Sequence, residues 1–208
     1  MNNERLTVRA LTNEEVPEVV DILCESFFDY PVMRIVVGAS QDYERRLNRL
    51  IYFFVMARVY RREVMLGVGD SGRMIGTALV SYPTRPENPP ELAKLREEVW
   101  EELGDAVRTK YEAFGAACAP LMPDDPHTHL NMIGVRRSAQ GKGVGRVLIE
   151  YVHQMSSEDP NSNGVSLTTE VEANVALYEH FGYELVGHTV ITHELETWGF
   201  FRADSSES

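Results

Sequence analysis

Hydrophobic residues recur along the first third of the chain at the spacing of one face of a helix. One such series lies between Thr12 and Pro31, and a second fills residues 42–60. The first series consists of Val16, Val19, Leu23 and Phe27. Thr12 and Glu15 have capping-box spacing ahead of it, and Pro31 disfavours helix in the residue before it. The pattern therefore predicts two amphipathic helices, the first of which begins after Thr12 and ends before Pro31.

Shorter apolar runs bounded by turn residues predict strands, and further periodic stretches predict more helices. The predicted strands are residues 6–11, 62–69, 73–83, 129–135, 165–169, 183–191 and 193–201. The predicted helical regions are residues 91–119, interrupted near Gly104, then 144–156 and 174–182. Strands and helices follow one another in one series without an internal repeat, which is typical of a mixed α/β domain. We expect a single domain over residues 1–202, with a helical insertion over about 84–126 and a disordered tail over 203–208.

Composition narrows the class of protein. The 208 residues carry a formal net charge of −12, which argues against general nucleic-acid binding because phosphate recognition needs a basic field. The first ten residues lack the apolar segment of a signal peptide, and no apolar run is long enough to cross a bilayer. Cys24 and Cys118 are too few for a disulfide framework and fit a reducing compartment. We expect a cytoplasmic monomer or homodimer that binds no metal, nucleic acid or membrane.

A basic, glycine-rich segment, RRSAQGKGVGR at residues 136–146, separates a predicted strand from a predicted helix. It fails the phosphate-loop pattern, because Gly143 stands where that pattern needs serine or threonine after Lys142. It also fails the dinucleotide fingerprint, because arginine stands at the third glycine position. It does fit Gln-x-x-Gly-x-Gly through Gln140, Gly143 and Gly145.

Such a loop can hold a pyrophosphate. The first turn of a helix has unpaired N–H groups and a positive dipole end, and glycines let an anion approach both. Four cations add charge nearby, namely Arg136, Arg137, Lys142 and Arg146. The alternative is a solvated basic turn whose glycines serve only the backbone conformation.

Two segments resemble the motifs of a known family. HLNMIGVRRSAQGKGVGRVLIEYV, from residue 129, resembles motif A of the GNAT superfamily of N-acetyltransferases, and NVALYEHFGYELVG, from residue 174, resembles motif B. The resemblance implies a central, mostly antiparallel mixed sheet that is splayed at an acetyl-CoA site and flanked by helices. The segments ESFFDYP, LTTEVEANVALYEHFGYE and TWGFF, with the insertion, look similar to the puromycin N-acetyltransferase-like branch.

The resemblance implies an acetyl-CoA-dependent N-acetyltransferase. In our interpretation it transfers acetyl to the primary amine of a small molecule, by direct attack in a ternary complex. Two alternatives stay open: a protein acetyltransferase that acts on a lysine or an N-terminus, and a non-catalytic acyl-CoA-binding sensor. Leu167 is followed by Thr168 and Thr169, which departs from the LET pattern of the puromycin-resistance enzymes and argues against puromycin as the acceptor.

The same resemblance implies a set of cofactor-binding residues. Backbone groups of the motif A strand pair with the pantetheine arm of acetyl-CoA, and the loop amides hold its pyrophosphate. The strand residues are Ile133, Gly134 and Val135, and the loop residues are Gln140, Gly141, Lys142, Gly143, Val144, Gly145 and Arg146. Asn174 matches a position that contacts the cofactor, and Tyr178 matches the tyrosine placed near the thioester sulfur.

Candidate catalytic residues follow from the chemistry of amine acetylation. Tyr178 is the candidate general acid, because a phenol can protonate a departing thiolate; its alternative role is packing against Phe181. His129, just before the motif A strand, is a candidate general base. Glu170 and Glu172, beyond the next strand, lie near the implied site as well. Proton loss through water without a single base is equally open.

The acceptor pocket is expected to involve the end of the first helix. Asp29 offers a carboxylate to a cationic amine, and Tyr30 offers a ring for stacking. Their alternative role is ordinary packing at a helix C-terminus.

Overall fold

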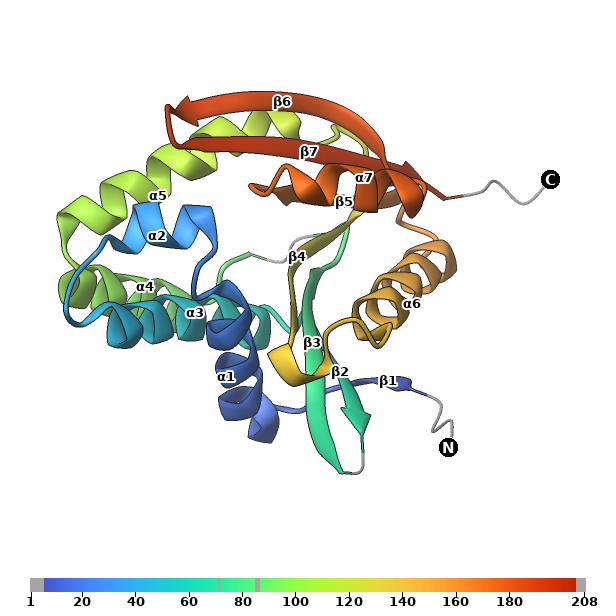
Figure 1. The fold of residues 1–208 in the computed structure, drawn as a ribbon, viewed down its shortest axis with the longest axis horizontal. Helices are drawn as coiled ribbons and strands as arrows, with labels where there is room; N and C mark the ends of the chain where they lie inside the picture. The colour runs from blue at the N-terminus through green and yellow to red at the C-terminus, as the bar shows by residue number, and fades with distance from the viewer. Residues whose placement is uncertain (1–5, 71, 85–86, 205–208) are drawn as a thin grey trace.

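The computed structural model describes residues 6–70, 72–84 and 87–204 and arranges them around a seven-stranded sheet (Figure 1). The sheet order is β1-β2-β3-β4-β5-β7-β6, and every neighbouring pair is antiparallel except β4 with β5. The strands are β1 (Thr7–Ala10), β2 (Val64–Asp70), β3 (Arg73–Ser81), β4 (Thr128–Val135), β5 (Gly164–Thr169), β6 (Glu184–Thr192) and β7 (Leu195–Ala203). This is the mixed, mostly antiparallel sheet that the resemblance implies.

Helices of different lengths flank this sheet. The α-helices are α1 (Val16–Phe27), α2 (Pro31–Val37), α3 (Tyr43–Tyr60), α4 (Pro90–Leu103), α5 (Asp105–Cys118), α6 (Val144–Glu158) and α7 (Ala173–His180). Short 3-10 turns are η1 (Asn13–Glu15), η2 (Ala119–Leu121) and η3 (Arg137–Ala139). Helices α4 and α5 with η2 fill the predicted insertion, and Gly104, at a φ of +87°, separates the two helices where the sequence predicts an interruption.

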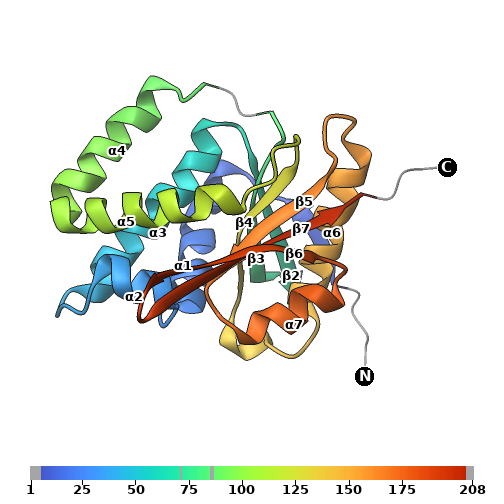
Figure 2. The same ribbon diagram turned by 90° about the horizontal axis from the view of Figure 1, so that it is seen from above.

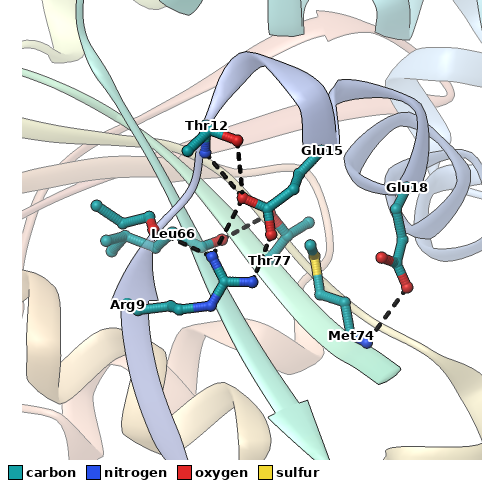
Figure 3. Close-up of polar contacts among 8 residues, drawn as sticks. Arg9, Thr12, Glu15, Glu18, Leu66, Met74 and Thr77 are labelled. Carbon is teal, nitrogen blue, oxygen red and sulfur yellow. Dashed lines mark hydrogen bonds and ion pairs between the residues drawn. The ribbon is translucent and has the colours of Figure 1, made fainter. Parts of the chain in front are cut away.

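The first helical segment begins at the predicted capping box (Figure 3). The Thr12 amide and hydroxyl both donate to Glu15 Oε2, over 2.9 and 3.2 Å, and Arg9 forms an ion pair with the same carboxylate. The Arg9 guanidinium, with the Thr12 amide, lowers the pKa of Glu15 to about 2. Turn η1 then leads directly into α1, which buries Val16, Val19, Val20, Ile22 and Leu23.

The helices cover both faces of the sheet and enclose two hydrophobic cores. Helices α1 and α3, with α2, α4 and α5 packed against them, cover one face, and α6 covers the other (Figures 1 and 2). Leu23 of α1 and Leu79 of β3 belong to the first core, whereas Leu148 of α6 and Val80 of β3 belong to the second. Neighbouring residues of one strand therefore serve opposite cores, as the alternation of a strand requires.

Strand β4 carries a bulge at Asn131. Leu79 of β3 pairs with Met132 and Val80 pairs with Leu130, so Asn131 is the extra residue. In a regular strand Leu130 and Met132 would face the same side. The bulge separates them, and they join different hydrophobic cores.

Strands β4 and β5 separate close to where they start. Their parallel pairing is confined to two residue pairs, Thr128 with Val165 and His129 with Ser166. On its other edge β4 stays paired with β3 as far as Val135. Among the described residues, no strand pairs with the β5-side edge of β4 from Leu130 onward. The sheet is therefore splayed, as the resemblance implies.

Two segments differ from the predicted elements. Pro31 begins α2, in a region to which the hydrophobic pattern assigned no element; the fixed φ of proline suits the first position of a helix. Strand β7 continues through Ala203, which pairs with Gly164 of β5, so the expected tail over 203–208 is wrong at its first residue. Residues 205–208 of that tail lie outside the described residues.

Candidate active site

A cavity of about 950 Å³ opens where β4 and β5 separate. Residues 130–133 of β4 form one side, the segment after β5 contributes Glu170, and α7 contributes Asn174 and Tyr178. The opposite wall comes from α1, α2, α3 and α5. Four side chains expected for catalysis or acceptor binding line this cavity: Tyr30, His129, Glu170 and Tyr178.

Glu170 is a buried carboxylate on the cavity. It is 9 % exposed, and Thr197 Oγ1 of β7 donates a hydrogen bond to Glu170 Oε1 over 2.8 Å. Burial raises the pKa of Glu170 to about 7, and hydrogen bonds from Thr197 and Tyr30 limit the rise. The carboxyl is thus close to half ionised at neutral pH, which is the condition for a general base.

Tyr178 lies on α7 in a largely apolar setting. It is 7 % exposed, and its ring packs against Tyr183 and Phe200, with centroid distances of 5.8 and 5.7 Å. Burial, with the nearby Glu170 carboxylate, raises the pKa of Tyr178 to about 12. The phenol is therefore protonated at neutral pH, and it can donate that proton.

His129 sits at the point where β4 and β5 part. Its Nδ1 lies 2.7 Å from Ser166 Oγ, and its carbonyl accepts a hydrogen bond from Asn131 Nδ2 over 2.9 Å. Asn131 Nδ2 also donates to Ser81 Oγ over 2.9 Å. The polar groups at the bulge are thus hydrogen-bonded to one another, and Ser166 orients the ring of His129.

The two expected acceptor residues lie in different places. Tyr30 lines the cavity, and its hydroxyl accepts a hydrogen bond from the Glu170 amide over 3.1 Å. Asp29 does not line it; its side chain is 70 % exposed and forms ion pairs with Arg34 and Arg137. Glu172 is also exposed and outside the cavity lining. The two neighbours differ because Tyr30 is the N-cap of α2 and has an extended backbone, with φ −70° and ψ 133°.

The glycine-rich loop ends at the N-terminus of α6. Gly141 and Gly143 have φ values of +75° and +81°, and Gly143 is the N-cap of the helix. A Cβ at either position would meet no atom within 4 Å, so both glycines border open space. At Gly134 glycine is needed for a different reason, namely close packing. A Cβ there would lie 2.9 Å from Ser26 Oγ of α1.

The cationic side chains near this loop differ in their exposure and in their partners within the protein. Arg136 is only 13 % exposed; its Nε donates to the Met74 carbonyl over 3.1 Å, and its Nη1 lies 3.3 Å from Glu25 Oε2. The Arg136 guanidinium is thus bound within the protein, whereas the sequence led us to expect it to add positive charge for an anion. Lys142 and Arg146 are exposed, and the guanidinium of Arg146 stands 5.9 Å from the ring centre of Phe181.

The arrangement suits acetyl-CoA. The unpaired edge of β4 offers backbone groups to an extended pantetheine arm, and the N-terminus of α6 offers amides to a pyrophosphate. The Val135 carbonyl already accepts a hydrogen bond from Ser26 Oγ over 3.3 Å, so one group of the expected set has a partner within the protein. Asn174 lines the cavity and donates to Thr169 Oγ1 over 3.0 Å. Within the described residues, no group of three or more histidine, cysteine or acidic side chains could hold a metal ion.

Several residues on or beside the cavity had no role assigned from the sequence. Thr197, the hydrogen-bond donor to Glu170, comes from β7. Phe54 of α3 and Tyr111 of α5 lie on the cavity and stack on each other, with ring centres 5.7 Å apart. Phe54 and Tyr111 are remote from both motifs along the chain, so only their tertiary placement brings them to the site.

Comparisons with known proteins agree with this geometry. Residues 99–185 match the model of the Acetyltransferase (GNAT) domain family, a stretch that runs from α4 to β6 and includes β4, the glycine-rich loop, α6, β5 and α7. No helix of the described residues is both long enough and apolar enough to span a membrane.

Solved structures share the fold at low identity. A structure from Corynebacterium glutamicum, described as histone acetyltransferase HPA2 and related acetyltransferase, is 20% identical, with a TM-score of 0.71 over 98% of this chain and 99% of that chain. The ribosomal-protein-S18-alanine N-acetyltransferase from Escherichia coli is 14% identical, with a TM-score of 0.58 over 98% and 96%. The C-terminal condensation domain of Ebony, in complex with beta-alanyl-dopamine, is 16% identical, with a TM-score of 0.62 over 96% and 99%. The match to a GNAT acetyltransferase domain over residues 99–185, on a chain that shares its fold with these structures, supports an acyltransferase.

Proposed function

We propose that the protein transfers acetyl from acetyl-CoA to the primary amine of a small molecule, by direct attack in a ternary complex. The observation that carries the proposal is the pair of buried titratable groups, Glu170 and Tyr178, on one cavity beside the unpaired edge of β4. Amine acetylation needs one group that takes a proton and one that gives a proton. The raised pKa values of this pair suit these two tasks.

Acetyl-CoA, when bound, supplies an acetyl thioester. We assign the backbone of residues 133–135 to its pantetheine arm and the amides of residues 140–146 to its pyrophosphate. Lys142 and Arg146 add positive charge at the N-terminus of α6, where the helix dipole acts in the same sense. Asn174 lies between Glu170 and Tyr178 in sequence, and it also lines the cavity.

The proton transfers follow from the two buried groups. Glu170 accepts a proton from the substrate ammonium, so that the nitrogen has a lone pair for the acetyl carbonyl. Tyr178 donates its phenol proton to the departing sulfur and regains the proton that the nitrogen loses as the C–N bond forms. One C–N bond forms, one C–S bond breaks, and one proton leaves to solvent from Glu170.

The fold alone admits acceptors of different sizes. The Escherichia coli neighbour is named for a ribosomal protein, whereas the Ebony domain is in complex with beta-alanyl-dopamine. A small acceptor is supported here by the insertion, because α5 and η2 help to wall the cavity. The resemblance to the puromycin N-acetyltransferase-like branch supports the same size class.

Cys24 and Cys118 are free thiols, which supports a cytoplasmic enzyme.

Release of coenzyme A in the presence of primary amines tests the proposal, with Tyr178→Phe as the variant. We expect the wild-type protein to release the thiol and form an acetylated amine. Tyr178→Phe removes the acid and keeps the ring, so kcat should fall by about 100-fold while the KM for acetyl-CoA stays unchanged.

Tyr183→Phe is the matched control. It removes a hydroxyl that is hydrogen-bonded to His153 and lies outside the cavity lining, so kcat should stay near that of the wild type. A protein that binds acetyl-CoA but acetylates no amine is the sensor rather than the enzyme. An unchanged chemical step in Tyr178→Phe removes Tyr178 from the mechanism.

A further inference from the structure

Aromatic rings form one wall of the cavity. This aromatic wall consists of Phe27, Tyr30, Phe54, Tyr111 and Phe114. Phe27 packs on Tyr30 with ring centres 4.8 Å apart, and Phe54 stacks on Tyr111 at 5.7 Å. A surface of this kind binds the apolar or aromatic body of a ligand.

The aromatic wall adjoins the buried carboxylate. Tyr30 belongs to the wall, and its hydroxyl accepts the hydrogen bond from the Glu170 amide over 3.1 Å. The backbone of Glu170 is therefore hydrogen-bonded directly to a residue of the wall. An amine held at Glu170 reaches the wall through a short arm.

The insertion closes this part of the cavity. At one end α5 is attached to α2, because Lys110 Nζ donates to the Ile35 carbonyl over 3.1 Å. At the other end η2 is packed against the β6–β7 hairpin: a Cβ on Gly199 would lie 2.6 Å from Leu121 Cβ, and a Cβ on Gly187 would lie 2.8 Å from Leu121 Cδ2. Figure 1 shows α5 extending from the region of α2 to the hairpin. The wall that carries Tyr111 and Phe114 is thus fastened at both ends.

The charged side chains on the cavity favour a cationic ligand over an anionic one. Asp124 and Asp125 line it with exposed side chains, and Glu170 lies inside. Among the described lining residues, Arg58 is the one lysine or arginine, and its Nε lies 2.8 Å from Glu63 Oε2. Since Glu63 already neutralises Arg58, a second carboxylate from a substrate would enter a negative site.

We propose that the acceptor is an arylalkylamine, that is, a primary ammonium on a short alkyl arm that carries an aromatic ring and no carboxylate. This inference rests on the proposed function and names its substrate class. The ammonium lies at Glu170 and the ring lies against the aromatic wall. An α-amino acid is disfavoured by its carboxylate, a polypeptide by the fastened insertion, and an aliphatic diamine by the apolar wall.

A panel of four amines at saturating acetyl-CoA tests the substrate class: 2-phenylethylamine, phenylalanine, 1,4-diaminobutane and a peptide with a free N-terminus and one lysine. We expect kcat/KM for 2-phenylethylamine to exceed each of the others by about tenfold or more. We also expect 2-phenylethylamine to bind the coenzyme A-loaded protein in calorimetry, without turnover. Equal or better acetylation of phenylalanine or 1,4-diaminobutane overturns the substrate class and leaves the proposed function standing. Equal or better acetylation of the peptide overturns the small-molecule acceptor as well. Acetylation of no amine overturns both.

Phe114→Ala tests the role of the wall, and Tyr52→Ala is its control. Both aromatic residues are half-buried against the first core, but Tyr52 does not line the cavity. Phe114→Ala should raise the KM for 2-phenylethylamine about tenfold, leave the KM for acetyl-CoA unchanged and leave kcat/KM for 1,4-diaminobutane unchanged. Tyr52→Ala should change none of these.

The milder variant Phe114→Leu keeps an apolar side chain and should shift the KM for 2-phenylethylamine in the same direction. Thermal unfolding confirms that each variant is folded. An unchanged KM for 2-phenylethylamine in folded Phe114→Ala, or an equal rise in Tyr52→Ala, overturns the inference.

Discussion

Burial makes Glu170 a different acid from an exposed glutamate. Its pKa rises from 4.5 to about 7 because the cavity wall withholds water from the carboxylate. Glu15 shows the opposite case, since Arg9 and the Thr12 amide lower its pKa to about 2. The same residue type thus stabilises a helix start at one position and stands ready to take a proton at another.

Glu170→Gln should separate catalysis from stability. Activity should fall by about 100-fold or more, because the base is lost, and wild-type kcat/KM should rise with pH through about 7 as Glu170 ionises. The stability of the wild-type protein should fall over the same pH range in which its activity rises. The folded pKa lies above the unfolded value, so the neutral carboxyl favours folding below pH 4.5, and this contribution of about 3 kcal/mol is lost as pH rises to about 7.

The two effects are measured by the pH dependence of kcat/KM and of the melting temperature between pH 5 and pH 8.5. The variant should melt at a higher temperature than the wild type at pH 8 and should lose the difference toward pH 5. Melting curves that stay parallel across this range would mean that Glu170 does not titrate with a raised pKa.

At the scale of elements, the N-terminus of α6 has the best-defined chemical task. Its amides and its dipole favour an anion, and Gly143 keeps the approach open. Lys142 is exposed at this end of the helix, so its charge can be changed without disturbing packing.

Lys142→Glu should weaken acetyl-CoA binding while the fold is retained. A glutamate at the start of a helix is favourable for the helix itself, so the melting temperature should not fall. The KM for acetyl-CoA should rise about fivefold at low salt and less at high salt. S-acetylpantetheine lacks the pyrophosphate, so its KM should not change. Lys94→Glu, on α4 and 80 % exposed, is the charge-matched control; an equal effect there would mean a general field rather than a site.

At the scale of the whole molecule, the splay between β4 and β5 gathers segments that are far apart in sequence around one cavity. A ligand that fills the splay binds the folded state alone, so it should stabilise the entire domain. At about 100 times its dissociation constant, acetyl-CoA should add about 2.7 kcal/mol, which is a rise of about 5–10 °C in melting temperature for a chain of this size. Differential scanning fluorimetry checks this, with NADH and ATP as comparison anions; equal shifts from all three would indicate an unspecific anion site.

The sequence by itself determined the local elements and the motif-borne part of the site. Helix period, capping residues and turn residues act between neighbours along the chain, so α1, the break at Gly104 and the strand–loop–helix unit around Gly143 were predictable from the residues in place. The resemblance to motif B led us to expect Tyr178 near the site, and Tyr178 lines the cavity.

Tertiary structure decided what those residues can do. Glu170 and Glu172 are the same residue type two positions apart, and the sequence alone does not distinguish them. Packing against Thr197 and Tyr30 buries Glu170, whereas Glu172 is exposed to water. Asp29 and Tyr30 are adjacent, yet the start of α2 directs one to solvent and the other to the cavity. Burial, and with it pKa and acceptor specificity, depends on residues from distant elements, because withholding water from a group takes neighbours on all sides, and a single stretch of chain supplies only some of them.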